Sequence, residues 1–257
     1  MDTSRPAVLV TGGAKRLGGA IAQKFGEAGW HVIIHYHSSS DDAQELADTL
    51  PSSEIIQCDL ADGDAAVRMV HDLSARTGNW QCLVNCASVF EYDDMRALDP
   101  ALSHNAIQVN AITPARMAQA YLSAARTTSG ACVINVTDMK IENTNPDFFS
   151  YTMSKNALHS AIGMLSKGRS NSADRIYGLA PGAILASHDQ SEGETDISHK
   201  LNLLGRKTGA DEIADAALFL AGRNLASGQT VFVDSGQHLL DQDRDVIYLA
   251  RDRAMEG

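Results

Sequence analysis

Short apolar runs alternate with longer amphipathic segments along most of the chain. Nearly continuous apolar runs predict strands buried on both faces, as in a parallel sheet covered by helices. The amphipathic segments between them predict helices. The predicted strands occupy 7–11, 30–36, 54–59, 81–87, 131–137, 175–180 and 230–234, and the predicted helices occupy 17–29, 41–50, 62–77, 101–126, 151–169 and 211–222. This order predicts an α/β fold: a single-domain doubly wound (Rossmann-type) parallel seven-stranded sheet with helices on both faces, spanning residues 1–257.

Two segments depart from this alternation. Residues 183–207 are polar and irregular and follow the end of a predicted strand. Loops at the carboxyl ends of parallel strands build the ligand site, so a substrate loop is favoured over an idle insertion. The tail 239–257 follows the last strand, and it either packs on a neighbouring subunit or frays.

Composition and charge narrow the class of protein. The chain is 44% hydrophobic and 21% charged, as in a globular protein with a large core, and its net charge is −11. An acidic chain is repelled by nucleic acid and by anionic membranes, so neither is expected as a partner. No secretion signal or membrane-spanning run is visible, and we expect a cytoplasmic enzyme. Cys58, Cys82, Cys86 and Cys132 lie in apolar runs without a CxxC spacing, which predicts buried reduced thiols and no metal site.

A glycine-rich turn follows the first predicted strand and leads into the first helix. Residues 11–19 read TGGAKRLGG. Glycines such as Gly12 and Gly18 let the backbone approach a pyrophosphate, whose charge is stabilised by the N–H groups at the helix N-terminus. In this position between strand and helix, the turn predicts dinucleotide binding.

The end of the second predicted strand favours NADPH over NADH. An acid there would bind the ribose 2′-hydroxyl of NAD, but the sequence HYHSSS at 35–40 contains none before Asp41. Lys15 in the glycine turn, with Ser38 and Ser39, offers donors to a 2′-phosphate. The alternative is that Lys15 and its neighbour Arg16 are only solvated surface charges.

Asp59 ends the third predicted strand and has two interpretations. Its carboxylate is placed to accept a hydrogen bond from the adenine amino group, or it caps the N-terminus of the following helix.

Candidate chemistry centres on three residues near the fifth strand. Tyr151 and Lys155 lie four residues apart, on one face of a predicted helix. A nearby cation stabilises a phenolate and makes tyrosine a better acid. Asp138 stands thirteen residues before the tyrosine, and it is either a proton carrier or a residue that caps a loop.

The ordered motifs resemble those of the short-chain dehydrogenase/reductase family over residues 7–236. Besides the glycine turn they are NCAS at 85–88, VNAITP at 109–114, YTMSK at 151–155, PG at 181–182 and VDSG at 233–236. The resemblance implies that Tyr151 donates a proton, that Lys155 lowers its pKa and binds the nicotinamide ribose, and that Asn110 anchors a water leading to bulk solvent. It also implies a homotetramer. The predicted cofactor contacts are Gly12, Lys15, Arg16, Leu17, Gly18, His37, Ser38, Ser39, Asp59, Leu60, Asn85, Ala87, Ser88, Tyr151, Lys155, Pro181 and Gly182.

Two departures from that family resemble one branch, the pteridine reductases and dihydromonapterin reductases. Arg16 replaces the second loop glycine and Asp138 replaces the usual serine, alongside KRLG at 15–18, HYHS at 35–38 and NCASVF at 85–90. This resemblance implies that Phe90 stacks on a pterin ring, although it could instead pack in the core. It implies that Ser88 binds the pterin or a cofactor phosphate and that Arg16 reaches towards the pyrophosphate and substrate. Pteridine reductases carry an arginine where Ser38 stands.

An acid at position 138 suits reduction of an imine. A carboxylate would repel the alkoxide formed from a ketone, whereas a C=N bond requires a proton on nitrogen, and a carboxyl group in an apolar pocket can carry one. The leading hypothesis is an NADPH-dependent oxidoreductase that converts a dihydropterin (dihydromonapterin, dihydrobiopterin or dihydrofolate) to its tetrahydro form. One alternative is a carbonyl reductase for 3-oxoacyl or other ketones, with Thr137 supplying the missing hydroxyl. The other is a non-catalytic module that senses NADP(H).

Overall fold

The protein forms one seven-stranded parallel sheet with strand order β3-β2-β1-β4-β5-β6-β7. The computed structural model describes residues 5–125, 127, 129–184 and 190–256. The predicted doubly wound α/β fold is confirmed. The strands are β1 Ala7–Val10, β2 His31–Tyr36, β3 Ser53–Gln57, β4 Trp80–Asn85, β5 Cys132–Val136, β6 Arg175–Pro181 and β7 Thr230–Val233.

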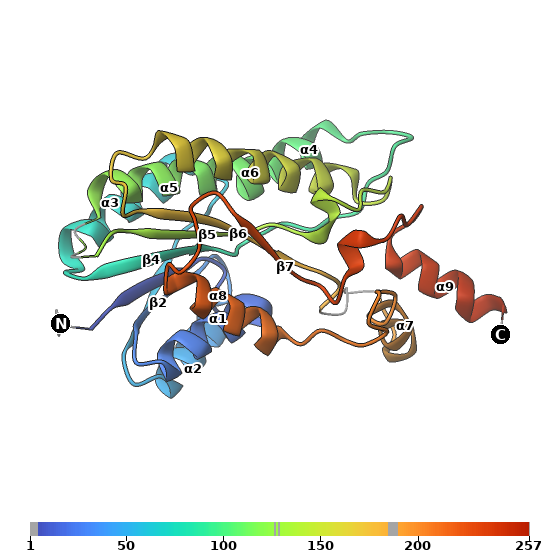
Figure 1. Ribbon diagram of the computed structural model, residues 1–257, viewed down its shortest axis with the longest axis horizontal. Coiled ribbons are helices and arrows are strands. Elements are labelled where there is room, and N and C mark those ends of the chain that lie inside the picture. The colour runs from blue at the N-terminus through green and yellow to red at the C-terminus, as the bar shows by residue number, and fades with distance from the viewer. Residues whose placement is uncertain (1–4, 126, 128, 185–189, 257) are drawn as a thin grey trace.

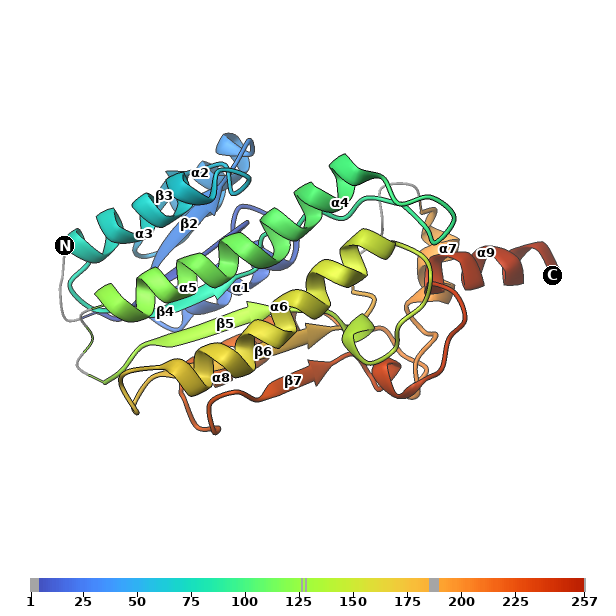
Figure 2. The same ribbon diagram turned by 90° about the horizontal axis from the view of Figure 1, so that it is seen from above.

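Two layers of helices enclose the sheet (Figure 1). Helices α3, α5 and α6 cover one face, and α1, α2 and α8 cover the other. Figure 2 shows α4, α5 and α6 running along the first face, with α7 and α9 beyond one end of the sheet. The helices are α1 Arg16–Glu27, α2 Ser40–Thr49, α3 Gly63–Arg76, α4 Pro100–Ile107, α5 Thr113–Ala124, α6 Phe149–Gly168, α7 Glu192–Ser198, α8 Ala210–Ala221 and α9 Val246–Glu256.

The two cores explain why the strands are apolar at nearly every position. In β1, Val8 and Val10 point into the core under α1 and α8, while Ala7 and Leu9 point into the core under α3 and α5. All four side chains are buried because neighbouring residues of a strand face opposite sides of the sheet. The pairing of β1 with both β2 and β4 also puts the reversal of strand order beside β1, where such folds bind ligands.

The helix predicted at 101–126 is divided. A π-helical segment, η1 (Gln108–Ile112), separates α4 from α5. Pro114 has no N–H and cannot donate to the carbonyl of Asn110, the bond that an α-helix would make there. The widened turn carries Asn110, which is buried.

Residues 183–207 are more regular than their polar sequence suggests. They contain α7, which begins with a capping box in which Ser191 Oγ accepts from Glu194 N and Glu194 Oε2 accepts from Ser191 N. The part of the predicted substrate loop at 185–189 lies outside the described residues.

The described part of the tail packs on its own chain, an arrangement that neither sequence interpretation included. Val246, Ile247 and Ala250 of α9 are buried within the same molecule. Arg251 of α9 donates to Glu194 of α7 at 2.9 Å. Burial of these apolar residues favours a docked tail over a frayed one.

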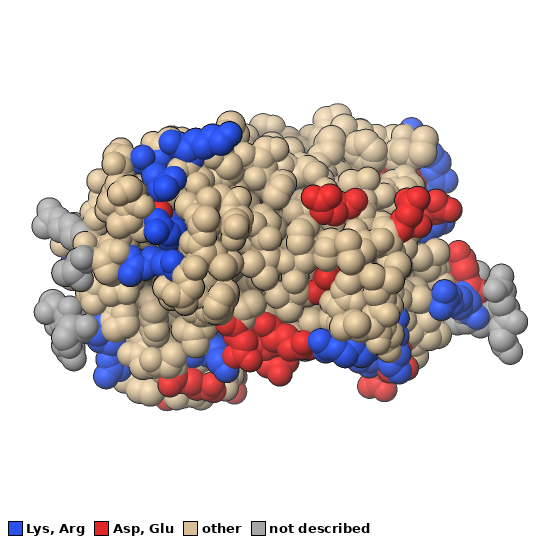
Figure 3. Space-filling model, viewed as in Figure 1, with Lys and Arg blue, Asp and Glu red and all other residues tan. Residues whose placement is uncertain are grey.

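Surface charge follows the acidic composition. On the face drawn in Figure 3, acidic side chains gather in the lower half beside smaller groups of Lys and Arg. Among the described residues, no helix has the length and apolar character needed to cross a bilayer.

Candidate active site

A cavity of about 780 Å³ lies at the carboxyl ends of the strands. Its walls come from the loops after β1 to β6 and from the start of α9. The predicted cofactor residues that line it are Gly12, Lys15, Arg16, Leu17, Gly18, His37, Asp59, Leu60, Ala87, Ser88, Tyr151, Lys155, Pro181 and Gly182, and the predicted substrate residues Phe90 and Asp138 line it too. The structure therefore brings together most of the residues that the motifs singled out, although they come from six loops.

Hydrogen bonds link the glycine turn to β2 and, through His35, to the residue that follows β3. Gly12 has a φ of +62°, and its N–H donates to Nδ1 of His35 at 3.1 Å. His35 Nε2 lies 3.0 Å from the carbonyl of Cys58, to which it donates. Burial lowers the pKa of His35 to about 4, so the ring stays neutral and can accept from Gly12. The sequence analysis assigned His35 no role, because its partners are backbone groups of two other segments.

Thr11 joins the same turn to β4. Its Oγ1 accepts from Cys86 N at 2.9 Å and from Ala87 N at 3.0 Å. Arg16, which takes the place of a loop glycine, has a φ of +53°. A non-glycine residue in this left-handed region stores about 1 to 3 kcal/mol of strain, which the surrounding contacts must hold in place.

Substitution of Gly18 tests whether the glycine turn binds the nucleotide. A Cβ there would collide with the carbonyl oxygen of Gly12, whereas a Cβ on Gly19 meets nothing nearer than 3.6 Å. We expect G18A to weaken NADPH binding by about 10- to 100-fold, because the turn must shift to relieve the overlap. The matched control G19A should leave the Kd within about 3-fold, as measured by titrating cofactor fluorescence. Equal effects of the two variants on the Kd would contradict nucleotide binding by the glycine turn.

Asp59 lies at the cavity wall, and its predicted contact with adenine stays a prediction. Asp59 lines the cavity, and its Oδ1 accepts from Ala61 N at 2.9 Å. The residue that caps α3 is Asp62, whose carboxylate accepts from Asp64 N and Ala65 N, so the capping interpretation of Asp59 is wrong. Lys15 lines the cavity and lies 3.3 Å from Asp42.

Four predicted residues do not line the cavity: Ser38, Ser39, Asn85 and Asn110. Asn85 donates to the carbonyl of Pro114 and to Asn135 Oδ1, so it ties β4 to its neighbours. Asn110 donates to Val89 O and Ser154 Oγ and accepts from Val89 N. Asn110 therefore fixes the loop after β4 against α6, behind the reacting groups.

The reacting groups meet after β5 and on the first turns of α6. Tyr151 OH donates to Asp138 Oδ2 at 2.7 Å, and Lys155 Nζ donates to the carbonyl of Val136 at 2.8 Å. Asp138 is partly buried, and Tyr151 and Lys155 are buried. The three side chains border one end of the cavity together.

Burial determines the protonation of this group. Burial raises the pKa of Asp138, while the hydrogen bond from Tyr151 opposes that rise. Burial, followed by the charge of Asp138, raises the pKa of Tyr151 well above its usual value. Burial also lowers the pKa of Lys155. The expected lowering of the tyrosine pKa by Lys155 is therefore not seen: the pKa of Tyr151 is raised, and its hydroxyl donates to Asp138.

Phe90 packs against other aromatic rings but is not a core residue, and its predicted stacking on a pterin ring stays a prediction. Its ring stacks on Phe148, with centroids 4.1 Å apart, and meets Tyr151 edge-on at 4.7 Å. It is nevertheless 39% exposed and lines the cavity. One face of the ring is packed in an aromatic cluster, and the ring remains available at the cavity wall.

Some lining residues were missed by sequence reasoning. Lys140, His199, Gln237, Asp245 and Ile247 line the cavity but carried no motif. Asp245 precedes the apolar start of α9, a helix-start signal that could have placed it in an ordered segment. Its position beside the site depends on long-range packing.

Comparisons with known proteins agree with this geometry. A family model described as Enoyl-(Acyl carrier protein) reductase matches residues 12–238. Pteridine reductase 1 of Leishmania tarentolae is 28% identical over 280 residues, covering 91% of this chain and 96% of that protein. The 3-oxoacyl-acyl-carrier-protein reductase FabG of Staphylococcus epidermidis is 26% identical over 255 residues, covering 91% and 99%. The crystal structure of FolM alternative dihydrofolate reductase 1 from Brucella canis, complexed with NADP, has a TM-score of 0.86 and 32% identity, covering 95% of this chain and 98% of that one.

The family match and the site lead to the same class. The match spans the glycine turn, the Asp138–Tyr151–Lys155 group and the last strand. The similarity to a pteridine reductase and to a FolM reductase extends over nine-tenths or more of the chain. The chain is an oxidoreductase that belongs to the short-chain dehydrogenase/reductase family, within the branch of the pteridine reductases.

Proposed function

We propose that this protein reduces a dihydropterin to its tetrahydro form with NADPH. The observation that carries the proposal is the hydrogen bond of 2.7 Å between Tyr151 OH and the carboxyl of Asp138 at the cavity wall. It places a protonatable acid where a ketone reductase of this family has a serine. The structural relative complexed with NADP and the pteridine reductase relative support the same cofactor and substrate class.

The nucleotide end of the cavity fits NADPH. The glycine turn has no room for a Cβ at Gly18, and no acid occurs in the first turn of α1. Both features suit a pyrophosphate at the helix N-terminus. Lys15 and His37 line the end where a 2′-phosphate would lie. Bound NADPH supplies the hydride, and the rest of the reaction depends on side chains of this chain.

Lys15 should determine part of the preference for NADPH. We expect K15A to weaken NADPH binding by about 5-fold, because a half-exposed cation beside a phosphate contributes on the order of 1 kcal/mol. NADH binding should stay within about 2-fold, since NADH lacks the 2′-phosphate. K24A is the matched control: Lys24 lies on α1, the helix that Lys15 precedes, pairs with Asp215 and does not line the cavity. Equal losses for both cofactors in K15A would argue against this role.

The chemistry requires one hydride on ring carbon and one proton on the adjacent ring nitrogen. The proposed proton carrier is the Asp138 carboxyl, whose raised pKa keeps it protonated to higher pH than an exposed aspartate. Tyr151 orients that carboxyl through its hydroxyl, and Lys155 holds the end of β5 through Val136. Because the three groups interact closely, they are expected to titrate together.

The ketone-reductase alternative has support from FabG relatives but lacks a hydroxyl at the right place. Thr137 Oγ1 donates to the carbonyl of Leu179 at 3.3 Å, and Thr137 is buried. Its hydroxyl is thus directed into β6 and not towards Tyr151. A carboxylate in place of the serine would also oppose the charge of a forming alkoxide.

The proposal is tested by the rate of NADPH oxidation with each candidate substrate. Dihydromonapterin, dihydrobiopterin and dihydrofolate should each be compared with a 3-oxoacyl thioester. We expect turnover with at least one dihydropterin and little with the ketone. Turnover of the ketone alone would overturn the proposal, and tight NADPH binding without any turnover would favour the sensing module. The homotetramer and the cytoplasmic location stay predictions from the sequence.

A further inference from the structure

A buried ion pair joins the C-terminal segment to the loop that carries Asp138. Lys140 Nζ lies 2.8 Å from Asp245 Oδ2, and the two side chains are only 3% and 6% exposed. The same ammonium group donates to Asn145 Oδ1 at 2.9 Å. Both Lys140 and Asp245 also line the cavity.

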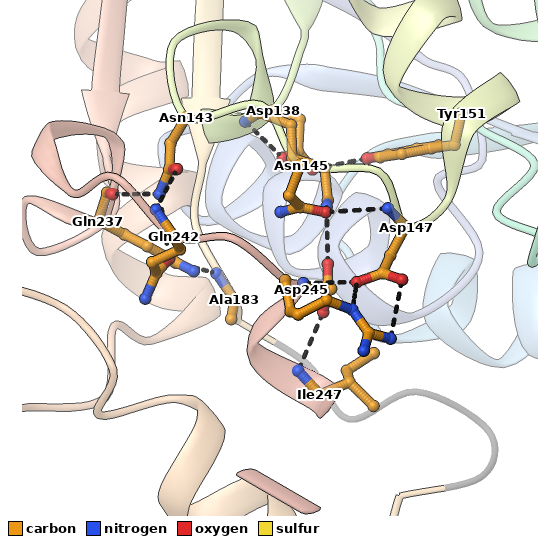
Figure 4. Close-up of polar contacts among 12 residues, drawn as sticks. Asp138, Asn143, Asn145, Asp147, Tyr151, Ala183, Gln237, Gln242, Asp245 and Ile247 are labelled. Atoms are coloured by element: carbon orange, nitrogen blue, oxygen red, sulfur yellow. Dashed lines mark hydrogen bonds and ion pairs between the residues drawn. The ribbon is translucent and has the colours of Figure 1, made fainter. Parts of the chain in front are cut away.

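Asp245 is fixed from several directions (Figure 4). Its Oδ1 accepts from Ile247 N at 3.0 Å at the start of α9, and its own N–H donates to Asp147 Oδ2 at 2.9 Å. Asp147 binds the Arg244 guanidinium with both oxygens, at 2.8 and 3.0 Å. The carboxylate of Asp245 is therefore held rigidly next to Lys140.

Lys140 in turn contacts the proposed acid. Its backbone N–H donates to Asp138 Oδ1 at 3.0 Å, while Tyr151 donates to the other oxygen, Oδ2. Figure 4 shows this chain of contacts from the tail to the Asp138–Tyr151 pair. The ion pair between Lys140 and Asp245 is thus linked to the carboxyl of Asp138 through the backbone of Lys140.

Stability alone is a weak reason for such a pair. Burying two charges carries a large desolvation penalty, and replacing a buried pair with apolar residues is often neutral or stabilising. A charge held beside an acid, by contrast, directly changes how readily that acid is protonated. The position of the pair therefore points to a role in the chemistry.

We propose that Lys140 and Asp245 are positioning residues that set the electrostatic potential at Asp138, so that the C-terminal segment completes the active site of its own chain. This inference rests on the proposed role of Asp138 as the proton carrier. The ammonium of Lys140 favours the ionised carboxylate, and Asp245 offsets that charge so that the carboxyl can keep its proton.

Asp245 acts on Asp138 through its ion pair with Lys140, whose charge lowers the pKa of Asp138. Burial, the largest influence, raises the pKa of Asp138, while Tyr151, Lys140 and Lys155 lower it. Asp245 raises the pKa of Tyr151 after burial and Asp138 do so. The thiol of Cys86, near Tyr151 and Lys155, has its pKa raised by burial to about 11, so that it carries no charge at neutral pH.

Two single variants should move the pH profile in opposite directions. The reaction needs the protonated acid, so kcat falls as pH rises through the pKa of that acid in the complex. In D245N the charge of Lys140 is uncompensated and favours the ionised carboxylate of Asp138. The fall of kcat at high pH, the alkaline limb of the pH profile, should therefore move to lower pH by about one unit. K140M leaves the Asp245 charge, and the limb should move to higher pH by about the same amount. The backbone bond from Lys140 to Asp138 is available in both variants.

The double variant K140M/D245N separates charge from folding. Removal of one partner strands a buried charge, whereas removal of both avoids that penalty. The double variant should fold, and its alkaline limb should lie between the limbs of the two single variants, because the two charge effects oppose each other. R251M is the matched control: it breaks the contact of α9 with Glu194 without changing a group that faces Asp138, and its limb should not move.

Infrared titration of the Asp138 carboxyl tests the inference without turnover. The carbonyl stretch of the protonated carboxyl would be followed against pH and assigned with D138N. We expect opposite shifts of the titration midpoint in D245N and K140M. Midpoints that stay fixed, or that move in the same direction, in folded variants would overturn the inference. Opposite shifts in a protein that reduces no dihydropterin would instead reject the proposed function and keep the electrostatic role.

Discussion

D138N is expected to lower kcat/KM for a dihydropterin by about 10³-fold, a typical contribution of a positioned acid. The amide has nearly the size of the carboxyl, and its oxygen can still accept the backbone N–H that Lys140 donates to Oδ1. It cannot, however, release a proton to the ring nitrogen. Steady-state NADPH oxidation at saturating cofactor measures the effect.

The Kd for NADPH provides the control for D138N. It should change by less than about 3-fold, because Asp138 stands at the substrate end of the cavity. D138S restores the serine of the wider family, and it should be as poor as D138N with the dihydropterin while retaining or gaining activity with a 3-oxoacyl thioester. Full dihydropterin turnover by D138N would show that the acid lies elsewhere.

Y151F should lower kcat by about 10² to 10⁴-fold. The hydroxyl of Tyr151 is the donor that orients Asp138, and its loss leaves the Oδ2 oxygen without that hydrogen bond. The ring itself is buried and meets Phe90 edge-on, so phenylalanine preserves the packing. Single-turnover reduction with bound NADPH isolates the chemical step from product release.

Y177F is the matched control for the loss of a buried hydroxyl. Tyr177 lies on β6, and its OH donates to the carbonyl of Leu225 at 2.6 Å, away from the cavity. This variant should lose stability by about 1 kcal/mol and keep its kcat within about 2-fold. A similar loss of kcat in both variants would mean that Y151F acts through folding.

The fold could be predicted from the sequence because its signals are local. Strands of a sheet covered on both faces are largely apolar, as in β1 and, apart from Asn135, in β5, and the helices between them are amphipathic. The same holds for the nucleotide end of the site, where Gly12, Lys15 and Gly18 belong to one short turn. Asp138, Tyr151 and Lys155 were found for a similar reason: their spacing places them at a strand end and on one helix face.

The remainder of the site depends on packing between distant segments. His35 is important because its ring happens to meet Gly12 and Cys58, and the sequence shows only a histidine in a strand. The Lys140–Asp245 pair joins the loop after β5 to the tail, and no spacing rule connects the two residues. The π-helical turn around Asn110 likewise looks like ordinary helix in the sequence until Pro114 is considered.

The pKa of Tyr151 shows why a motif alone can mislead. The pairing of tyrosine and lysine predicts a phenol made more acidic, but burial and Asp138 raise the pKa of Tyr151 in this protein. Burial raises the pKa of Asp138 as well, although the hydrogen bond from Tyr151 opposes that rise. These two shifts are the reason why the proposed function assigns the proton-carrying role to the carboxyl of Asp138 and not to the phenol.

A crystal structure of the ternary complex with NADP⁺ and a dihydropterin would test the proton transfer most directly. The distance to measure joins the ring nitrogen beside the hydride-accepting carbon to the nearest oxygen of Asp138 or Tyr151. We expect about 3 Å, within hydrogen-bond reach. A carboxyl group of Asp138 turned to bulk solvent, with no acid facing that nitrogen, would contradict dihydropterin reduction at this site.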